Sequence, residues 1–249
     1  MTGSYLLGKN ESRKKTYKSE KNIVNELLNF HSFSQYQEDI VLFCVFYDIE
    51  NGFYIDVGAN DPVKMSVTKS FYLRGWNGIN IEPLPNKYEL LLNDRKRDIN
   101  LNFGVGKEKG TATLYLRGPG STFEKIYQKE NLTTLNINVD TMENVCKKYV
   151  PKGKKIEFCK IDVEGGEKDV LLGYDFKNYR PKIFCIESTK PSTNSPSHHE
   201  WEDILIKNNY SFIYKYVINR FYVDNNYIEE LRDKFNYIHK IIKLYNILK

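Results

Sequence analysis

The chain has 249 residues, 41% of them apolar and 28% charged. This composition is typical of a folded globular protein and excludes a disordered chain; no uncharged apolar run reaches the roughly 18 residues of a membrane-spanning helix, so we expect no transmembrane segment. The net charge of +5 comes mainly from residues 1–33, with six Lys and Arg against three acids, whereas residues 34–223 carry 26 against 25, so we expect no nucleic-acid partner.

Three parts are expected along the chain. Residues 1–33 form a basic N-terminal arm that ends in a short helix, residues 34–223 form the central domain, and residues 224–249 form a C-terminal amphipathic helix. The arm shows only a short apolar stretch and no small-residue cleavage site, which is unlike a secretory signal, so a cytoplasmic location is expected. The central domain is predicted to begin with a buried helix capped by Ser34.

Strands and helices alternate through the central domain. The predicted strands are 52–61, stopping at Gly58, then 77–81, 99–105, 111–116, 155–163 and 181–186, followed by a hairpin over 210–223 that turns at Asn219-Arg220. The predicted helices between them are 66–73, 86–92, 141–149, 168–172 and 199–207. This alternation predicts an α/β fold with a doubly wound, mostly parallel sheet and helices on both faces.

The C-terminal segment carries an apolar stripe whose members recur at intervals of three and four residues, which predicts one long helix. They are Ile228, Leu231, Phe235, Ile238, Ile242 and Tyr245. Several interpretations stay open. The stripe could pack on the chain's own domain, it could join a second copy in a homo-oligomer, or it could lie on a membrane surface.

Acidic residues follow the predicted strands, and ligands of doubly wound sheets bind beyond the carboxyl ends of the strands. The turn from Asp56 through Gly58 to Asn60 is neither a dinucleotide fingerprint nor a P-loop, so it suits a ligand without phosphates. Glu82 follows Gly58 by 24 residues, near the place where an acid hydrogen-bonds a ribose diol. These features predict an adenosine site, for which S-adenosylmethionine is the common ligand. The alternative is that Asp56 caps a helix and Glu82 is solvated.

Asp162 and Glu164 end the strand at 155–163, where a period of two places both carboxylates on the same side. They could position the amine of the cofactor, act as a base or hold a metal, although Glu164 could instead serve helix entry. A divalent ion held by Asp162, Glu187 and a third ligand is chemically reasonable. The sequence shows no decisive ligand set, so no metal site is predicted.

Six segments in order and at compatible spacing resemble the FkbM family of S-adenosylmethionine-dependent methyltransferases. They are SQYQED (34–39), GFYIDVGANDP (52–62), FYLRGWNGINIEPLP (71–85), RDINLNFGVG (97–106), KIDVEGGE (160–167) and NRFYV (219–223). The resemblance implies a class I methyltransferase (Rossmann-like) fold and O-methylation of a sugar or another hydroxyl-bearing metabolite. The cofactor contacts that it implies are Gln35, Asp39, Asp56, Gly58, Asn60, Glu82, Pro83, Asp162 and Glu164. The expected substrate contacts are Ser121 and Thr122, which match the family's Ser-Thr element after the third strand, and Asn219 and Arg220 of NRFYV.

Methyl transfer to a neutral hydroxyl needs a group that draws off the proton, because a hydroxyl is a poor nucleophile. The candidates are Asp162, Glu187 and His199, and His199 is alternatively an exposed residue at a helix entry. The predicted function is an S-adenosylmethionine-dependent O-methyltransferase acting on a small-molecule or glycan hydroxyl. The alternative is a weak or inactive methyltransferase-fold domain that serves as an assembly or tethering module.

Overall fold

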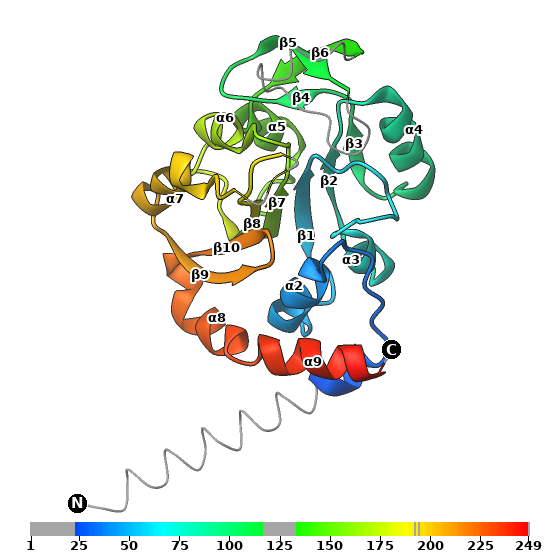
Figure 1. Cartoon of the computed structure of the whole chain (residues 1–249), viewed down its shortest axis with the longest axis vertical. Helices are drawn as coiled ribbons and strands as arrows, with labels where there is room; N and C mark the ends of the chain where they lie inside the picture. The colour runs from blue at the N-terminus through cyan, green and yellow to red at the C-terminus, as the bar shows by residue number, and fades with distance from the viewer. Residues whose placement is uncertain (1–22, 117–132, 192, 194, 249) are drawn as a thin grey trace, which may run out of the picture.

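The computed structural model describes residues 23–116, 133–191, 193 and 195–248. Its main sheet has seven strands in the order β3-β2-β1-β7-β8-β10-β9, and β10 runs antiparallel to both neighbours while the other pairs are parallel (Figure 1). The strands are β1 (Phe53–Val57), β2 (Asn77–Ile81), β3 (Ile99–Leu101), β7 (Ile156–Ile161), β8 (Pro181–Glu187), β9 (Tyr210–Tyr216) and β10 (Asn219–Asp224). The predicted α/β fold with a mostly parallel sheet is confirmed.

Both faces of the central strands are buried, as their almost continuously apolar sequences require. Tyr54 and Phe158 belong to the apolar cluster on one face, and Ile55 and Cys159 to the cluster on the other. The helices on the first face are α2 (Glu38–Phe46), α3 (Lys69–Leu73), α8 (Ile228–Phe235) and α9 (Ile238–Leu248). The helices on the second face are α5 (Met142–Tyr149), α6 (Glu167–Leu172) and α7 (Glu202–Lys207). Helix α4 (Pro85–Asp94) packs beside β3.

A second, three-stranded sheet lies at the opposite end of the molecule from α8 and α9 (Figure 1). Its strands, in the order β4-β6-β5, are β4 (Gly104–Val105), β5 (Gly110–Tyr115) and β6 (Thr134–Asp140). The strand predicted over 99–105 is therefore two strands in different sheets. Strand β6 was not predicted, although Leu135, Ile137 and Val139 alternate with polar residues there.

The entry to the central domain differs from the prediction. Helix α2 begins at Glu38, and Gln37 before it has the left-handed φ of 68°. Ser34 lies outside the helix, where its Oγ donates to Asp39 Oδ1 at 2.7 Å. The predicted start of the helix at Ser34 is wrong because the Asp39 carboxylate binds residues 32–34 outside the helix, where Ser34 forms a β-bridge with Met65.

The C-terminal segment forms two helices, α8 and α9, so the single helix predicted within 224–249 is wrong. Most of the apolar stripe is buried in the same cluster as α2 and the helical residues 23–27, and Figure 1 shows α8 and α9 lying along that side of the molecule. The hydroxyl of Tyr245 accepts from the backbone of Ser32 at 3.0 Å. The stripe thus packs on the chain's own domain, and both the homo-oligomer and the three-part division of the chain stay predictions.

The predicted hairpin is present, but its turn is at Val217 and Ile218. Asn219 and Arg220 already belong to β10, and they pair with Tyr216 and Lys215 of β9. Their expected place in the turn is therefore wrong. In the ranges given above, the structure has no helix that is long and apolar enough to span a membrane.

Candidate active site

A cavity of about 460 Å³ opens at the carboxyl ends of β1, β2, β7 and β8, within the range of roughly 300–1,000 Å³ common to small-molecule sites. Parallel strands point their carboxyl ends to one edge of the sheet, so residues from distant segments meet there. Eight of the predicted site residues line the cavity: Gln35, Gly58, Asn60, Glu82, Pro83, Asp162, Glu164 and Glu187.

The β1–β2 side of the cavity (Gly58, Asn60 and Glu82) is held by backbone hydrogen bonds. The amide of Gly58 donates to the carbonyl of Ile81 at 3.0 Å, which extends the β1–β2 pairing into the turn. Gly58 has a φ of 77°, and a Cβ there would overlap the backbone carbonyl oxygen of Asp162. Only glycine allows the turn to pack this closely on the end of β7.

Glu82 is 4% exposed and reaches this turn from the end of β2. Its Oε2 accepts from the amide of Asn60 at 2.7 Å, and its Oε1 accepts from the amide of Leu84 at 2.9 Å. Burial raises the pKa of Glu82, while the two amide hydrogen bonds act in the opposite direction. Each oxygen keeps a second lone pair, so the carboxylate can still accept from a ligand in the cavity.

The β7–β8 side of the cavity (Asp162, Glu164 and Glu187) gathers three carboxylates. One oxygen from each lies within 4.8 Å of one from each of the others. Glu187 is 7% exposed, its Oε1 accepts from Thr189 Oγ1 at 3.2 Å, and its Oε2 has no hydrogen-bond partner among the described residues. Burial, together with the negative charges of Asp162 and Glu164, raises the pKa of Glu187 well above its ordinary value.

Glu167 stabilises the loop that carries Glu164 by accepting hydrogen bonds from its backbone amides. Glu164 and Gly165 have φ values of 54° and 103°, and Glu167 Oε1 accepts from the amides of Val163 at 3.1 Å and Gly165 at 3.2 Å. Burial raises the pKa of Glu167 to about 7. Glu164 therefore projects from a left-handed turn whose amides are already bonded.

Lys160 joins the two sides. It is 8% exposed, and its Nζ donates to the carbonyl of Gly58 at 2.9 Å and lies 3.5 Å from Asp56 Oδ1 and 3.4 Å from Asp162 Oδ2. Burial lowers the pKa of Lys160, but the carboxylates of Asp162 and Asp56 outweigh it and raise the pKa overall. Sequence reasoning missed this residue, although a lysine inside the mostly apolar β7 was a usable signal.

Asp56 lies beneath the cavity rather than on its wall. It is 1% exposed, and its Oδ2 accepts from Thr68 Oγ1 at 2.8 Å. Its position fits a role in holding Lys160 and the turn after β1.

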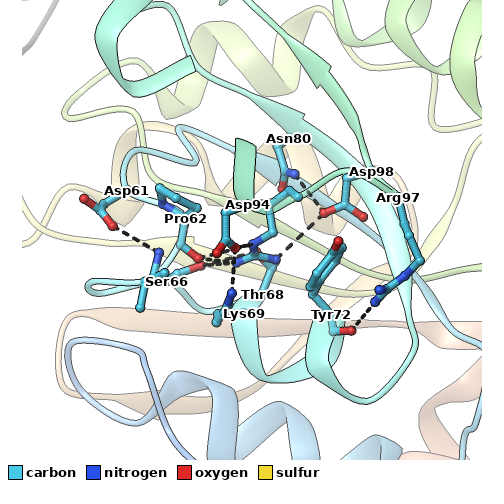
Figure 2. Close-up of polar contacts among 12 residues, drawn as sticks. Asp61, Pro62, Ser66, Thr68, Lys69, Tyr72, Asn80, Asp94, Arg97 and Asp98 are labelled. Carbon is cyan, nitrogen blue, oxygen red and sulfur yellow. Dashed lines mark hydrogen bonds and ion pairs between the residues drawn. The ribbon is translucent and has the colours of Figure 1, made fainter. Parts of the chain in front are cut away.

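A buried network supports the segment that follows this turn. Arg95, with no exposed surface, donates from Nη2 to the carbonyl of Pro62 at 2.7 Å and to Ser66 Oγ at 2.9 Å. Its Nη1 lies 3.8 Å from Asp98 Oδ2, and Asp98 also accepts from Asn80 at 2.9 Å. Figure 2 shows Pro62, Ser66, Asn80 and Asp98 gathered in this way. The loop between β1 and α3 is thereby fixed relative to β2 and α4.

Three predicted residues lie away from the cavity wall. His199 has a side chain 64% exposed and lies 3.8 Å from Glu200, in the 3-10 helix before α7. Arg220 pairs with Glu202 at 2.8 Å. Asp39 is fully buried and accepts hydrogen bonds from residues 32–34. Their predicted roles have no support from this geometry.

Asn219 is also absent from the wall, because its Nδ2 donates to the buried Glu38 Oε1 at 2.7 Å and so ties β10 to the start of α2. Ser121 and Thr122, the other predicted substrate contacts, lie outside the described residues.

Sequence reasoning did not single out the remaining wall residues, although Tyr36 and Phe103 lie in two of the motifs that carry the family resemblance. Examples are Tyr36, Met65, Phe103, Leu114, Thr189 and Ile218. Each belongs to a different part of the chain, and only the tertiary fold brings them together. They add apolar and aromatic surface to an otherwise acidic cavity.

The sequence was compared with known proteins. The Methyltransferase FkbM domain matches residues 56–213. Methyltransferase sdnD of Sordaria araneosa is 24% identical to the chain, in an alignment that covers 68% of the chain and 82% of that protein. A solved structure, that of the mitomycin 7-O-methyltransferase MmcR, matches 80% of the chain with a TM-score of 0.35. The two sequences are 11% identical. The chain spans about half, 52%, of that structure, and a likeness this low does not bear on function.

Proposed function

Since the chain belongs to the FkbM family of methyltransferases, we propose that it uses S-adenosylmethionine to methylate a hydroxyl of a sugar, a glycan or a related small metabolite. The observation that carries the proposal is the acidic cavity at the carboxyl ends of β1, β2, β7 and β8. This cavity supports the proposal because it gathers carboxylates and a glycine turn at one edge of the sheet.

The residues on the β1–β2 side fit this cofactor. Glu82 has free lone pairs for the two hydroxyls of a ribose, and Gly58 leaves the backbone open to close approach. Four carboxylates and two lysines line the cavity. Such a wall favours a ligand with a sulfonium and an ammonium group over a ligand with phosphates.

When bound, S-adenosylmethionine supplies a methyl group that an acceptor oxygen takes in line, with a C–O bond forming as the C–S bond breaks and its electron pair stays on sulfur. The protein must orient that oxygen and receive or release its proton. Asp162 and Glu187 line the cavity and are our candidates to interact with the acceptor, whereas His199 does not line it.

Calorimetric titration with S-adenosylmethionine tests the cofactor part of the proposal. We expect one site per chain, and we expect Glu82→Ala to weaken binding by roughly 10- to 100-fold, because about 1.5–3 kcal/mol of charged hydrogen bonding is lost. Glu89→Ala, a change of an exposed acid on α4, is the matched control and should bind like the wild type.

Two outcomes of the titration would contradict the proposal. They are the absence of binding to the folded wild type, and equal binding by wild type and Glu82→Ala. The first is what the alternative function, an inactive assembly or tethering module, predicts.

The acceptor is the second part of the proposal. Tyr36 and Phe103 line the cavity, and aromatic faces pack well against sugar rings. Mass spectrometry of reactions with a panel of sugar nucleotides and glycans should show a product in which one methyl group replaces a hydroxyl hydrogen. Methylation on nitrogen or carbon alone, across a broader panel, would contradict O-specificity.

A further inference from the structure

Glu187 presents a buried oxygen that the described part of the protein leaves unsatisfied. Its side chain ends on the cavity wall, the residue is 7% exposed, and its Oε2 has no hydrogen-bond partner there. A buried polar atom without a partner is costly, so such an atom in a native site commonly marks a missing water or ion. The chemistry of the surrounding residues indicates which kind of ligand would satisfy this oxygen.

The neighbours of Glu187 identify the charge of that ligand. Oxygens of Asp162 and Glu164 lie within 4.8 Å of a Glu187 oxygen and of one another. Three carboxylates this close repel each other unless protons or a cation lie between them. Oxygen donors alone are the set that hard divalent cations such as Mg²⁺ and Mn²⁺ prefer.

Lysines of the described chain do not supply this charge to Glu187. Lys160 is placed between Asp56 and Asp162, and Lys190 lies 3.1 Å from Glu200 outside the cluster. Asp162 Oδ2 lies 3.4 Å from Lys160 Nζ, and a carboxylate with one such neighbour can still bind a second cation. Glu187 therefore has no lysine partner in the described chain, and an external cation can balance its charge.

We propose that Asp162, Glu164 and Glu187 bind one divalent cation of the Mg²⁺ or Mn²⁺ class, on the opposite side of the cavity from Glu82. The cation's part in catalysis rests on the proposed function: it holds the acceptor hydroxyl and lowers its pKa, so that the O–H proton leaves to solvent water and the oxygen pair forms the new C–O bond. The binding itself does not depend on the reaction.

Mn²⁺ binding, followed by the loss of the free-ion electron paramagnetic resonance signal, tests the site directly. We expect one ion per wild-type chain. Glu187→Gln and Asp162→Asn should each weaken binding roughly tenfold or more, because each removes a charged ligand. The matched control Glu89→Gln removes an exposed acid on α4 and should bind like the wild type.

A second measurement covers the case of a variant that folds poorly. In EDTA, Glu187→Gln should unfold at or above the wild-type temperature, because a neutral amide relieves the repulsion among the acids. Added Mn²⁺ should raise the unfolding temperature of the wild type and leave that of Glu187→Gln unchanged.

Two results would overturn the site: no Mn²⁺ bound by the folded wild type at millimolar concentration, or equal Mn²⁺ affinity in the wild type and Glu187→Gln. The second is what a proton shared between Glu187 and Asp162 would give. Titration of S-adenosylmethionine in EDTA separates the two proposals. Cofactor binding without Mn²⁺ binding defeats the metal site alone, and Mn²⁺ binding without cofactor binding defeats the proposed function.

Discussion

Glu82 and Glu187 occupy equivalent places on the two sides of the cavity, yet their surroundings differ. Both are strand-end glutamates, 4% and 7% exposed, and burial raises the pKa of each. Each oxygen of Glu82 accepts a backbone amide, whereas Glu187 Oε2 accepts nothing in the described chain and faces two further acids. Backbone amides satisfy both oxygens of Glu82, while Glu187 has no lysine or arginine partner among the described residues.

Lys160 contacts residues on both sides of the cavity, so its replacement should lower the free energy of unfolding more than the other changes proposed here. Lys160→Met leaves Asp56, 1% exposed, without its cation, so we expect the free energy of unfolding to fall by about 3–5 kcal/mol. Urea denaturation measures the loss. Lys182 on β8 is a matched control, since it is also 8% exposed but meets Glu157 only at 4.0 Å. Lys182→Met should lose less than half as much, and equal losses would contradict the linking role of Lys160.

Gly58→Ala tests the close contact between the two sides. The new Cβ would overlap the carbonyl of Asp162 at a φ of 77°, so we expect a loss of about 3 kcal/mol in unfolding free energy and loss of cofactor binding. Gly153→Ala is the matched control, because Gly153 has a φ of 75° and no atom within 4 Å of the new Cβ. It should cost about 1 kcal/mol. Similar costs for the two variants would show that the turn does not press on β7.

Glu167→Gln tests the support of the β7–β8 side through its pH dependence. The folded pKa of Glu167 is raised from 4.5 to about 7, so its stabilising contribution is complete below the lower value and is lost as pH rises through the higher one. Between about pH 5 and about pH 8 the wild type should lose about 2–3 kcal/mol more stability than the variant. Thermal or urea unfolding across this range measures the difference. Parallel pH profiles would contradict the assignment.

The sequence predicted the site best where local signals were strong. Gly58, Asn60 and Glu82 stand directly after apolar strands, and parallel strands must end at the same edge, so their meeting in the cavity followed from topology. Asp162 and Glu187 were found in the same way. The family resemblance added Gln35 and Pro83, both of which line the cavity.

Other features depend on tertiary contacts that no local pattern reveals. Asn219 occurs in a predicted site motif, but it is a strand residue whose amide is bonded to Glu38. The apolar stripe from Ile228 to Tyr245 indicates helix, but its periodicity could not show the break at residues 236–237 or decide that α2 covers it. The grouping of Glu187 with two further acids likewise arises only when β7 and β8 pair in the sheet.

A crystal structure with S-adenosylhomocysteine and Mn²⁺ tests most directly whether the two sides take different ligands. We predict that the ribose hydroxyls lie against Glu82 and that an anomalous Mn²⁺ peak lies between Asp162, Glu164 and Glu187. A cofactor bound outside the cavity, or one whose ribose contacts the three acids in place of Glu82, would contradict the account.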